Sequence, residues 1–186
     1  MIKLIAGLGN PGDRYAKTRH NAGFWLLEQL GERFVEERKF FGLYEKVLLG
    51  GAPVHLLKPL TFMNASGKSL RALAQFYQLA PEEILVVHDE LDLPEGEVRL
   101  KFSGGHGGHN GLRDIIAQLG SKDFYRLRLG IDRPRDSSQV VGYVLDAPNR
   151  AGQDKIDEAL RRGVQILPVL LRDGAEKAMH QLHSKP

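Results

Sequence analysis

The chain has 186 residues, 42% of them hydrophobic, and a formal net charge of +3, which predicts one domain over residues 1–186 and is too little charge to indicate nucleic-acid binding by itself. It contains no cysteine, which excludes disulfides, thiolate nucleophiles and cysteine-bound zinc. No apolar run approaches the roughly 20 residues that cross a membrane and no signal-peptide pattern is present, so we expect a cytoplasmic protein without a membrane partner.

Short apolar runs alternate with amphipathic segments along the chain. Strands are expected at 2–8, 46–49, 54–57, 84–87, 98–102 and 126–131. Helices are expected at about 21–37, with Asn21 as a possible N-cap, and at 64–77, 110–119 and 151–172, the last interrupted at Pro168 and followed by a tail. Gly50-Gly51 between two strand-like runs predicts a hairpin. We therefore predict an α/β fold, a single-domain mixed twisted β-sheet flanked by helices on both faces.

Polar side chains gather in three loops. In an α/β sheet, ligands bind beyond the carboxyl ends of the strands, because loops there can aim polar groups without disturbing the core. Each of the three loops contains asparagine, and two also contain histidine. Their candidate functional residues are Asn10, His20, Asn64, His109 and Asn110.

A carboxylate is expected at the same edge of the sheet. Asp89 follows the apolar run 84–87, so its side chain should emerge beside the loop that contains His20. A carboxylate bonded to one imidazole nitrogen fixes the tautomer and leaves the other nitrogen free to take a proton from water. The three asparagine carboxamides can donate to a carbonyl and accept from an amide N–H, which suits a peptide backbone. These residues predict a hydrolytic site that uses neither metal nor cofactor.

Three local patterns resemble other catalytic motifs but lack their context. The glycines within 7–12 have the spacing of a dinucleotide fingerprint, yet no helical pattern begins directly after them. The run 67–69 ends like a nucleoside-triphosphate loop, but Phe62 stands where that loop needs a glycine. Ser66 lacks the elbow of a nucleophilic serine and is expected to pack near a helix start.

Metal-dependent hydrolysis is the main chemical alternative. Neither a zinc-protease motif nor another specific metal spacing is present, and a glycine-rich loop does not fix ligand geometry unaided. In an apolar strand, His88 is typical of a core histidine, and His106 is expected to shape its loop. The candidate ligands are His88, Asp89, Asp92, His106 and His109.

A non-catalytic RNA-binding module is the alternative from a different class. Basic residues cluster in the first loop and at 122–135, where five basic residues stand against two acidic ones. A basic rim around the crevice favours an anionic substrate. Aromatic residues make up only 8% of the chain, and no stacking platform for RNA bases is evident.

Motifs follow one another at regular spacing over nearly the whole chain. They are Gly7-Leu-Gly-Asn-Pro-Gly12 with Tyr15 and Thr18-Arg-His-Asn21, Lys58-Pro59 with Met63-Asn64 and Ser66-Gly67, His88-Asp-Glu-Leu-Asp-Leu-Pro94, Gly104-Gly-His-Gly-Gly-His-Asn-Gly111, Arg126-Leu-Arg128 with Gly130, and Val141-Gly-Tyr-Val-Leu145. In this combination the chain resembles the bacterial peptidyl-tRNA hydrolase family.

The resemblance implies a monomeric, metal-free α/β hydrolase that cleaves the ester between a peptide and the 3′ ribose of tRNA, so peptidyl-tRNA is the expected partner. It implies that His20 is the general base and that Asp89 holds it, with Asn10 as a third catalytic residue. The groove residues that it implies are Tyr15, Phe62, Met63, Asn64, His109 and Asn110, and the residues that contact the tRNA phosphate are Lys101 and Arg128.

Two further expectations concern single residues. Asp132 stands where the family usually has a second glycine, and its negative charge near Arg128 and Arg133 is expected to weaken phosphate contact. Asn10 is expected to select peptidyl-tRNA over aminoacyl-tRNA, because a neutral amide pairs with a peptide carbonyl that a free amino acid lacks.

Overall fold

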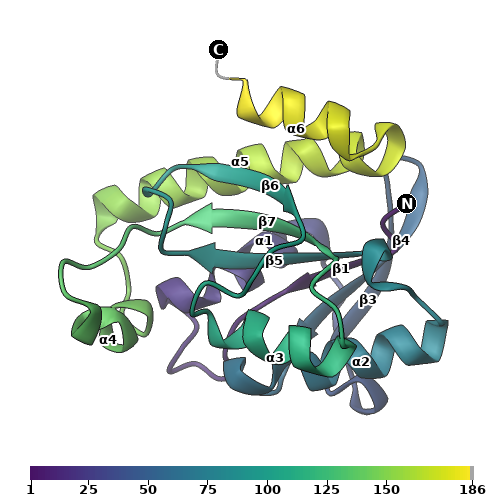
Figure 1. Ribbon diagram of the computed structural model, residues 1–186, viewed down its shortest axis with the longest axis horizontal. Coiled ribbons are helices and arrows are strands. Elements are labelled where there is room, and N and C mark those ends of the chain that lie inside the picture. The colour runs from purple at the N-terminus through teal and green to yellow at the C-terminus, as the bar shows by residue number, and fades with distance from the viewer. Residues whose placement is uncertain (185–186) are drawn as a thin grey trace.

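A computed structural model describes residues 1–184, and its sheet has seven strands in the order β2-β3-β4-β1-β5-β7-β6 (Figure 1). β1 pairs in parallel with β4 and β5, and β5 pairs in parallel with β7. The other three pairs are antiparallel, which confirms the predicted mixed sheet. The strands are β1 (Leu4–Gly7), β2 (Val35–Glu37), β3 (Gly42–Leu49), β4 (Ala52–Pro59), β5 (Ile84–Glu90), β6 (Val98–Phe102) and β7 (Tyr125–Gly130).

The predicted hairpin joins β3 to β4. Leu49 pairs with Ala52, which leaves Gly50 and Gly51 as a two-residue loop. Both glycines have positive φ, 60° and 79°, as the turn type that matches the twist of two antiparallel strands requires.

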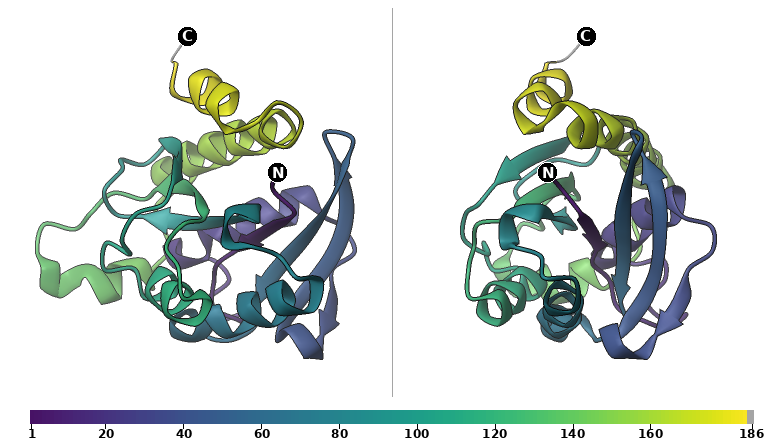
Figure 2. Two further views of the ribbon diagram at one scale, coloured as in Figure 1. Left: turned by 45° about the vertical axis from the view of Figure 1, so that its right-hand side comes forward. Right: turned by 90° about the vertical axis from the view of Figure 1, so that its right-hand side faces the viewer.

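Helices cover both faces of the sheet, as predicted. α1 (Ala22–Leu30), α5 (Arg150–Asp173) and α6 (Ala175–His183) pack on one face, and α2 (Ser66–Tyr77) and α3 (Asn110–Leu119) pack on the other. Figure 2 shows the two helical layers with the sheet between them. Side chains alternate along β1, so Leu4 and Ala6 join the α2–α3 core while Ile5 joins the α1–α5 core. Among residues 1–184, no helix is long and apolar enough to span a bilayer.

Three predictions about the helices are wrong, and the strand expected at 46–49 begins earlier, at Gly42. The helix expected at 21–37 ends at Leu30, because Gly31 is extended at φ −132° and residues 35–37 pair with β3 instead. Pro168 does not interrupt the last long helix, and the nearby residues Leu167 and Leu170 are buried in the core. Gly174, at φ 94°, ends that helix instead, and the expected tail forms α6 up to His183.

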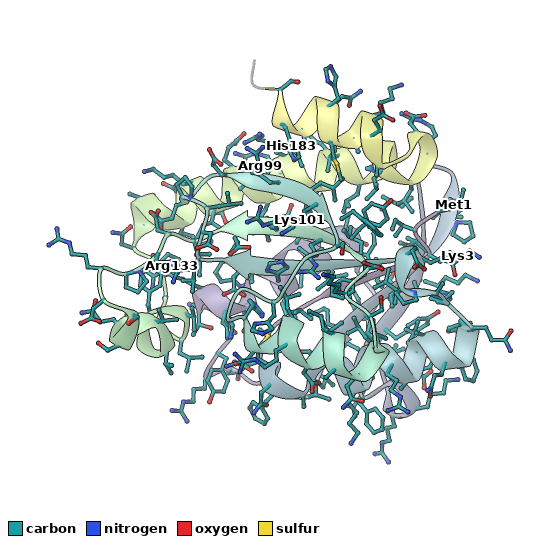
Figure 3. All side chains as sticks on the ribbon, viewed as in Figure 1. Met1, Lys3, Arg99, Lys101, Arg133 and His183 are labelled. Carbon is teal, nitrogen blue, oxygen red and sulfur yellow. The ribbon has the colours of Figure 1, made fainter. Side chains whose placement is uncertain are left out.

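The loops that carry polar residues reach one place by different routes. The loops after β1 and β4 leave the sheet at the edge where β5 ends, as the parallel pairing requires. β6 is antiparallel to β7, so the loop at 103–109 starts from the opposite edge and crosses the sheet to the start of α3. On the same side of the sheet Arg99 and Lys101 of β6 are exposed, and this side of β6 and β7 is called the open part of the sheet below. Figure 3 shows Arg99 and Lys101 along this open part of β6, between α6 and α3.

Candidate active site

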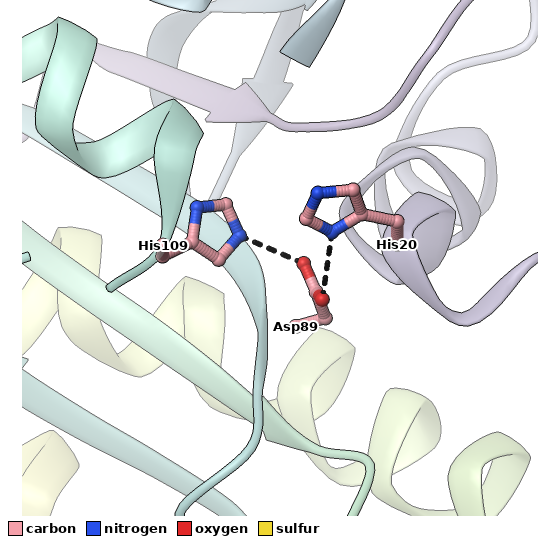
Figure 4. A group of neighbouring side chains, drawn as sticks. All are labelled: His20, Asp89 and His109. Atoms are coloured by element: carbon pink, nitrogen blue, oxygen red, sulfur yellow. Dashed lines mark hydrogen bonds and ion pairs between the residues drawn. The ribbon is translucent and has the colours of Figure 1, made fainter. Parts of the chain in front are cut away.

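One carboxylate joins two imidazoles at the centre of this edge. His20 lies in a short 3-10 helix after β1, Asp89 lies in β5, and His109 is the N-cap residue of α3. His20 Nδ1 is 2.8 Å from Asp89 Oδ2, and His109 Nε2 is 2.8 Å from Asp89 Oδ1 (Figure 4). The carboxylate is buried, with 2% of its residue surface exposed. Each of its oxygens therefore serves a different histidine.

The hydrogen bonds define both tautomers. His109 Nδ1 accepts from the backbone N–H groups of Gly111 at 3.1 Å and Leu112 at 3.3 Å, so its proton is on Nε2 and is donated to Asp89. His20 donates from Nδ1 to the same carboxylate. Its Nε2 lies on the side of the ring away from Asp89 (Figure 4) and keeps its lone pair when the ring is neutral. His20 is thereby prepared to accept a proton.

The same contacts shift the pKa values of the two central groups. Burial by itself would raise the pKa of Asp89, but the imidazoles of His20 and His109 outweigh it and hold that pKa far below its usual range. Burial would lower the pKa of His20, and the charge of Asp89 and its hydrogen bond reverse this, so the pKa of His20 is raised. The carboxylate thus stays ionised and favours the imidazolium that forms when His20 takes a proton.

A cavity of about 340 Å³ opens beside this group. The apolar wall opposite the loops includes Val140, Val144 and Leu145, from α4 (Val140–Val144) and the residue after it. Tyr15 is not among the lining residues but stands edge-on to Phe62 with ring centroids 6.2 Å apart. The predicted site residues that line the cavity are Asn10, His20, Phe62, Met63, Asn64, Asp89, His109 and Asn110.

Asn10 is held so that its amide nitrogen has no hydrogen-bond partner among residues 1–184. Its Oδ1 accepts from the backbone N–H of Met63 at 2.7 Å, which identifies the other atom as Nδ2, a donor. Asn21 binds the backbone of Asn10 on both sides, with 2.8 Å from Asn10 N–H to its Oδ1 and 2.9 Å from its Nδ2 to the Asn10 carbonyl. Asn21 occupies the N-cap position of α1, as expected, but its side chain makes no cap bond and joins the two ends of the first loop instead.

Comparison with known proteins identifies the family. The model of the family described as peptidyl-tRNA hydrolase matches residues 4–186. The chain belongs to the peptidyl-tRNA hydrolase family. The peptidyl-tRNA hydrolase of Dichelobacter nodosus is 57% identical to it, over 99% of this chain and 100% of that protein, and that of Neisseria meningitidis serogroup C is 54% identical, over 99% and 98%. The crystal structure of peptidyl-tRNA hydrolase from Acinetobacter baumannii matches with a TM-score of 0.95 at 45% identity, covering 98% of this chain and 95% of that chain.

In this member of the peptidyl-tRNA hydrolase family, the two residues expected at the tRNA phosphate lie on the open part of the sheet. Lys101 on β6 is opposite Arg126 on β7, and Arg128 is opposite Arg99. Lys101 is exposed, whereas Arg128 Nε donates to Glu90 Oε1 at 3.0 Å. Lys101 and Arg128 thus share a face, but they are not directly paired across the strands.

Asp132 occupies a turn that favours glycine. Its φ is 63°, in the left-handed region that aspartate tolerates better than most residues. Its N–H donates to the carbonyl of Leu93 at 3.0 Å. Arg133 pairs with Asp92 at 2.6 Å, so the expected influence of Asp132 on phosphate binding stays a prediction.

The five residues weighed as metal ligands do not all come together. Asp92 is exposed beside Arg133, and His106 Nδ1 accepts from the N–H of Gly108, which shapes the loop as expected. His88 is buried and its Nδ1 donates to the carbonyl of Asp89 at 2.8 Å. Within residues 1–184, the group whose ligand atoms lie within 4.8 Å of one another is His20, Asp89 and His109.

Sequence reasoning missed two contributors. Glu90 lines the cavity and pairs with Arg128, yet nothing in the sequence distinguishes it from an ordinary strand-end acid. The apolar residues of α4 also line the cavity. Val141 and Val144 belong to a motif of the family resemblance, which was the available signal.

Proposed function

We propose that this chain hydrolyses the ester bond that joins a peptide to the 3′ ribose of tRNA, with His20 as the general base. The observation that carries the proposal is the free Nε2 of His20, held by a buried carboxylate at the wall of a cavity that asparagine carboxamides also line. Family membership supports the substrate class.

The reaction needs only water and these side chains. His20 Nε2 takes a proton as the water oxygen bonds to the ester carbonyl carbon, and Asp89 stabilises the imidazolium. The tetrahedral intermediate then collapses, the bond to the 3′ oxygen breaks, and the imidazolium returns its proton to that oxygen. An ester has a better leaving group than an amide, so positioned water suffices without a covalent intermediate. Carboxamide N–H groups at the cavity supply donors for the oxyanion.

The tautomer of His109 favours a metal-free mechanism. Two imidazoles and a carboxylate are a ligand set that zinc accepts, and the group His20, Asp89 and His109 has that composition. A metal at this group would need the lone pair of His109 Nε2. That nitrogen carries the ring proton, because Nδ1 accepts from Gly111 and Leu112 at the start of α3. Metal binding would therefore move the ring proton to Nδ1 and remove the two hydrogen bonds that cap α3.

Selection for a peptide is assigned to Asn10. Because Oδ1 is turned to Met63 N–H, the group of this amide that is offered to the substrate is the donor Nδ2. A donor pairs with the carbonyl of a peptide bond and repels the ammonium group that a free aminoacyl ester would place there. This arrangement supports a preference for peptidyl-tRNA over aminoacyl-tRNA.

The tRNA body is assigned to the open part of the sheet, where Lys101 and Arg128 would bind a backbone phosphate. We propose that the chain acts as a monomer, as the family resemblance implies. Because its substrate takes part in translation, the proposed place of action is the cytoplasm.

A hydrolysis assay with substrate in excess tests the proposal. The wild type should turn over many equivalents of peptidyl-tRNA and keep its rate in a chelator. His20→Ala should lose about 10²- to 10⁴-fold in rate, the contribution of a general base. The matched control is His180→Ala, which removes an exposed histidine on α6 and should leave the rate unchanged.

Two outcomes would favour the alternatives. Tight tRNA binding without ester cleavage by the wild type would indicate an RNA-binding module. Loss of wild-type activity in chelator, restored by a divalent ion, would indicate a metal hydrolase. Circular dichroism of each variant establishes that a lost rate is not a lost fold.

A further inference from the structure

Arg126 is a buried cation whose hydrogen bonds reach a loop of the site. It is 2% exposed, and its guanidinium lies 4.4 Å from the ring centroid of Phe124. The guanidinium donates to three backbone carbonyls, those of Gly105 at 2.7 Å, Gly104 at 2.5 Å and Lys122 at 3.1 Å. Among the described residues its Nε has no hydrogen-bond partner. Burying a charge that is not fully bonded costs stability, so a structural role alone does not explain this arginine.

Two of these carbonyls belong to the loop at 103–109, which crosses the open part of the sheet and ends at His109. Packing does little to place this loop, because a Cβ added at Gly105, Gly107 or Gly108 would meet nothing within 4 Å. At its start, Ser103 N–H donates to the carbonyl of Phe124 at 2.9 Å. At its end, His109 donates to Asp89. Between these two points, the hydrogen bonds from the guanidinium fix the position of the loop.

We propose that Arg126 is a positioning residue for the hydrolysis: by holding the carbonyls of residues 104 and 105, it sets where the loop delivers His109 and Asn110 to the active site. The inference rests on the proposed function. Arg126 itself touches no reacting atom. It acts through the bond between His109 and Asp89, and through the place of Asn110 in the cavity wall.

This role predicts a specific signature in the pH dependence. If the loop is displaced, Asp89 loses its hydrogen bond from His109. Its negative charge is then balanced by His20 alone, so the pKa of His20 rises. The titratable and charged groups that face His20 are Asp89 from β5 and His109 from α3, with Glu90 further along the cavity. The acidic limb of the kcat profile should therefore move to higher pH.

A role in phosphate binding makes a different prediction. Lys101 lies against the same loop, since a Cβ on Gly104 would stand 2.6 Å from Lys101 Nζ. In this alternative, Arg126 contributes only positive charge to the face that binds the phosphate. Such a role would raise KM for intact tRNA and leave kcat on a phosphate-poor substrate unchanged. A minimal ester, N-acetylaminoacyl adenosine, separates the two roles because it lacks the tRNA body.

The experiment measures kcat, KM and the kcat–pH profile of the minimal ester with wild type and two variants. Arg126→Met should lower kcat about 10- to 100-fold, the cost of a misplaced catalytic group, with a smaller change in KM and the acidic limb at higher pH. Arg126→Lys keeps the charge but not the fork that spans two carbonyls, and it should recover part of the rate. Arg71→Met, which removes an exposed arginine of α2, is the matched control and should behave as wild type.

A further variant keeps the test decisive if Arg126→Met does not fold. Gly104→Ala leaves Arg126 in place but puts a Cβ against Lys101 at a residue with φ 120°, and it should lower kcat and shift the pH profile in the same direction. Wild-type kcat and pH profile in folded Arg126→Lys and Gly104→Ala would overturn the proposal. So would an effect of either variant confined to KM on intact tRNA. Failure of the wild type to cleave any ester would instead refute the proposed function.

Discussion

Replacing Asp89 with asparagine should disable His20 by changing its tautomer. A carboxylate accepts from both histidines, whereas a carboxamide accepts at one end and donates at the other. His109 must donate from Nε2, because its Nδ1 is occupied by the N–H groups of Gly111 and Leu112. The amide oxygen will therefore face His109 and the NH₂ group will face His20. His20 then accepts at Nδ1 and carries its proton on Nε2, where a base is needed.

The expected loss is large. An aspartate-to-asparagine exchange that imposes the wrong imidazole tautomer costs about 10⁴-fold in serine proteases, and general-base catalysis contributes about 10²- to 10⁴-fold. We expect kcat of Asp89→Asn to fall by about three to four orders of magnitude, or about 4–5 kcal/mol of barrier. The measurement is single-turnover release of peptide from peptidyl-tRNA, with folding checked by circular dichroism.

A second substitution tests the tautomer argument itself. His109→Asn retains a good N-cap for α3 but withdraws the imidazole from residue 89. In the double variant Asp89→Asn/His109→Asn, the amide oxygen can turn to His20 Nδ1 and restore the productive tautomer. The double variant should therefore be about tenfold more active than Asp89→Asn, although His109→Asn alone loses activity. Equal or lower activity in the double variant would refute this reasoning, as would Asp89→Asn with more than about a tenth of the wild-type kcat.

Three further predictions follow from single residues. Asn10→Asp should reduce the ratio of peptidyl-tRNA to aminoacyl-tRNA hydrolysis, because an acceptor replaces the free donor; an unchanged ratio contradicts that role. Lys101→Ala and Arg128→Ala should each weaken the binding of intact tRNA substrates more than the binding of 3′-end analogues. Each should also reduce the slope of log binding constant against log salt concentration by about 0.7, and equal losses on both substrates contradict a phosphate contact. Burial lowers the pKa of His88 to about 3. Between pH 6.5 and pH 3, His88 is therefore protonated in the unfolded chain but neutral in the folded protein, so the free energy of unfolding falls as the pH drops toward 3. Urea unfolding at pH 7 and pH 5 should show that His88→Asn loses less stability over this range than wild type, and an equal loss contradicts the shift.

Much of the fold could be predicted because its signals are local. Alternating and helical periodicities depend on near neighbours in the chain, and they placed α3 at 110–119 and the hairpin at Gly50-Gly51 as the structure has them. The helix predicted over 31–37 is wrong because that prediction also used only local signals. Phe34 and Val35 continue a helical spacing, but the exposed edge of β3 offers residues 35–37 a strand pairing that no local pattern records.

The candidate site shows a similar division. The sequence by itself determined which residues are candidates for the site, since His20, Asn64 and Asp89 stand in short motifs at or after the ends of apolar runs. Only the tertiary structure decided that Asp89 serves two histidines and that Asn21 fastens Asn10. It also decided that the loop to His109 arrives from the far edge of the sheet over Arg126. The physical reason is that these contacts depend on strand order and direction, which long-range packing sets.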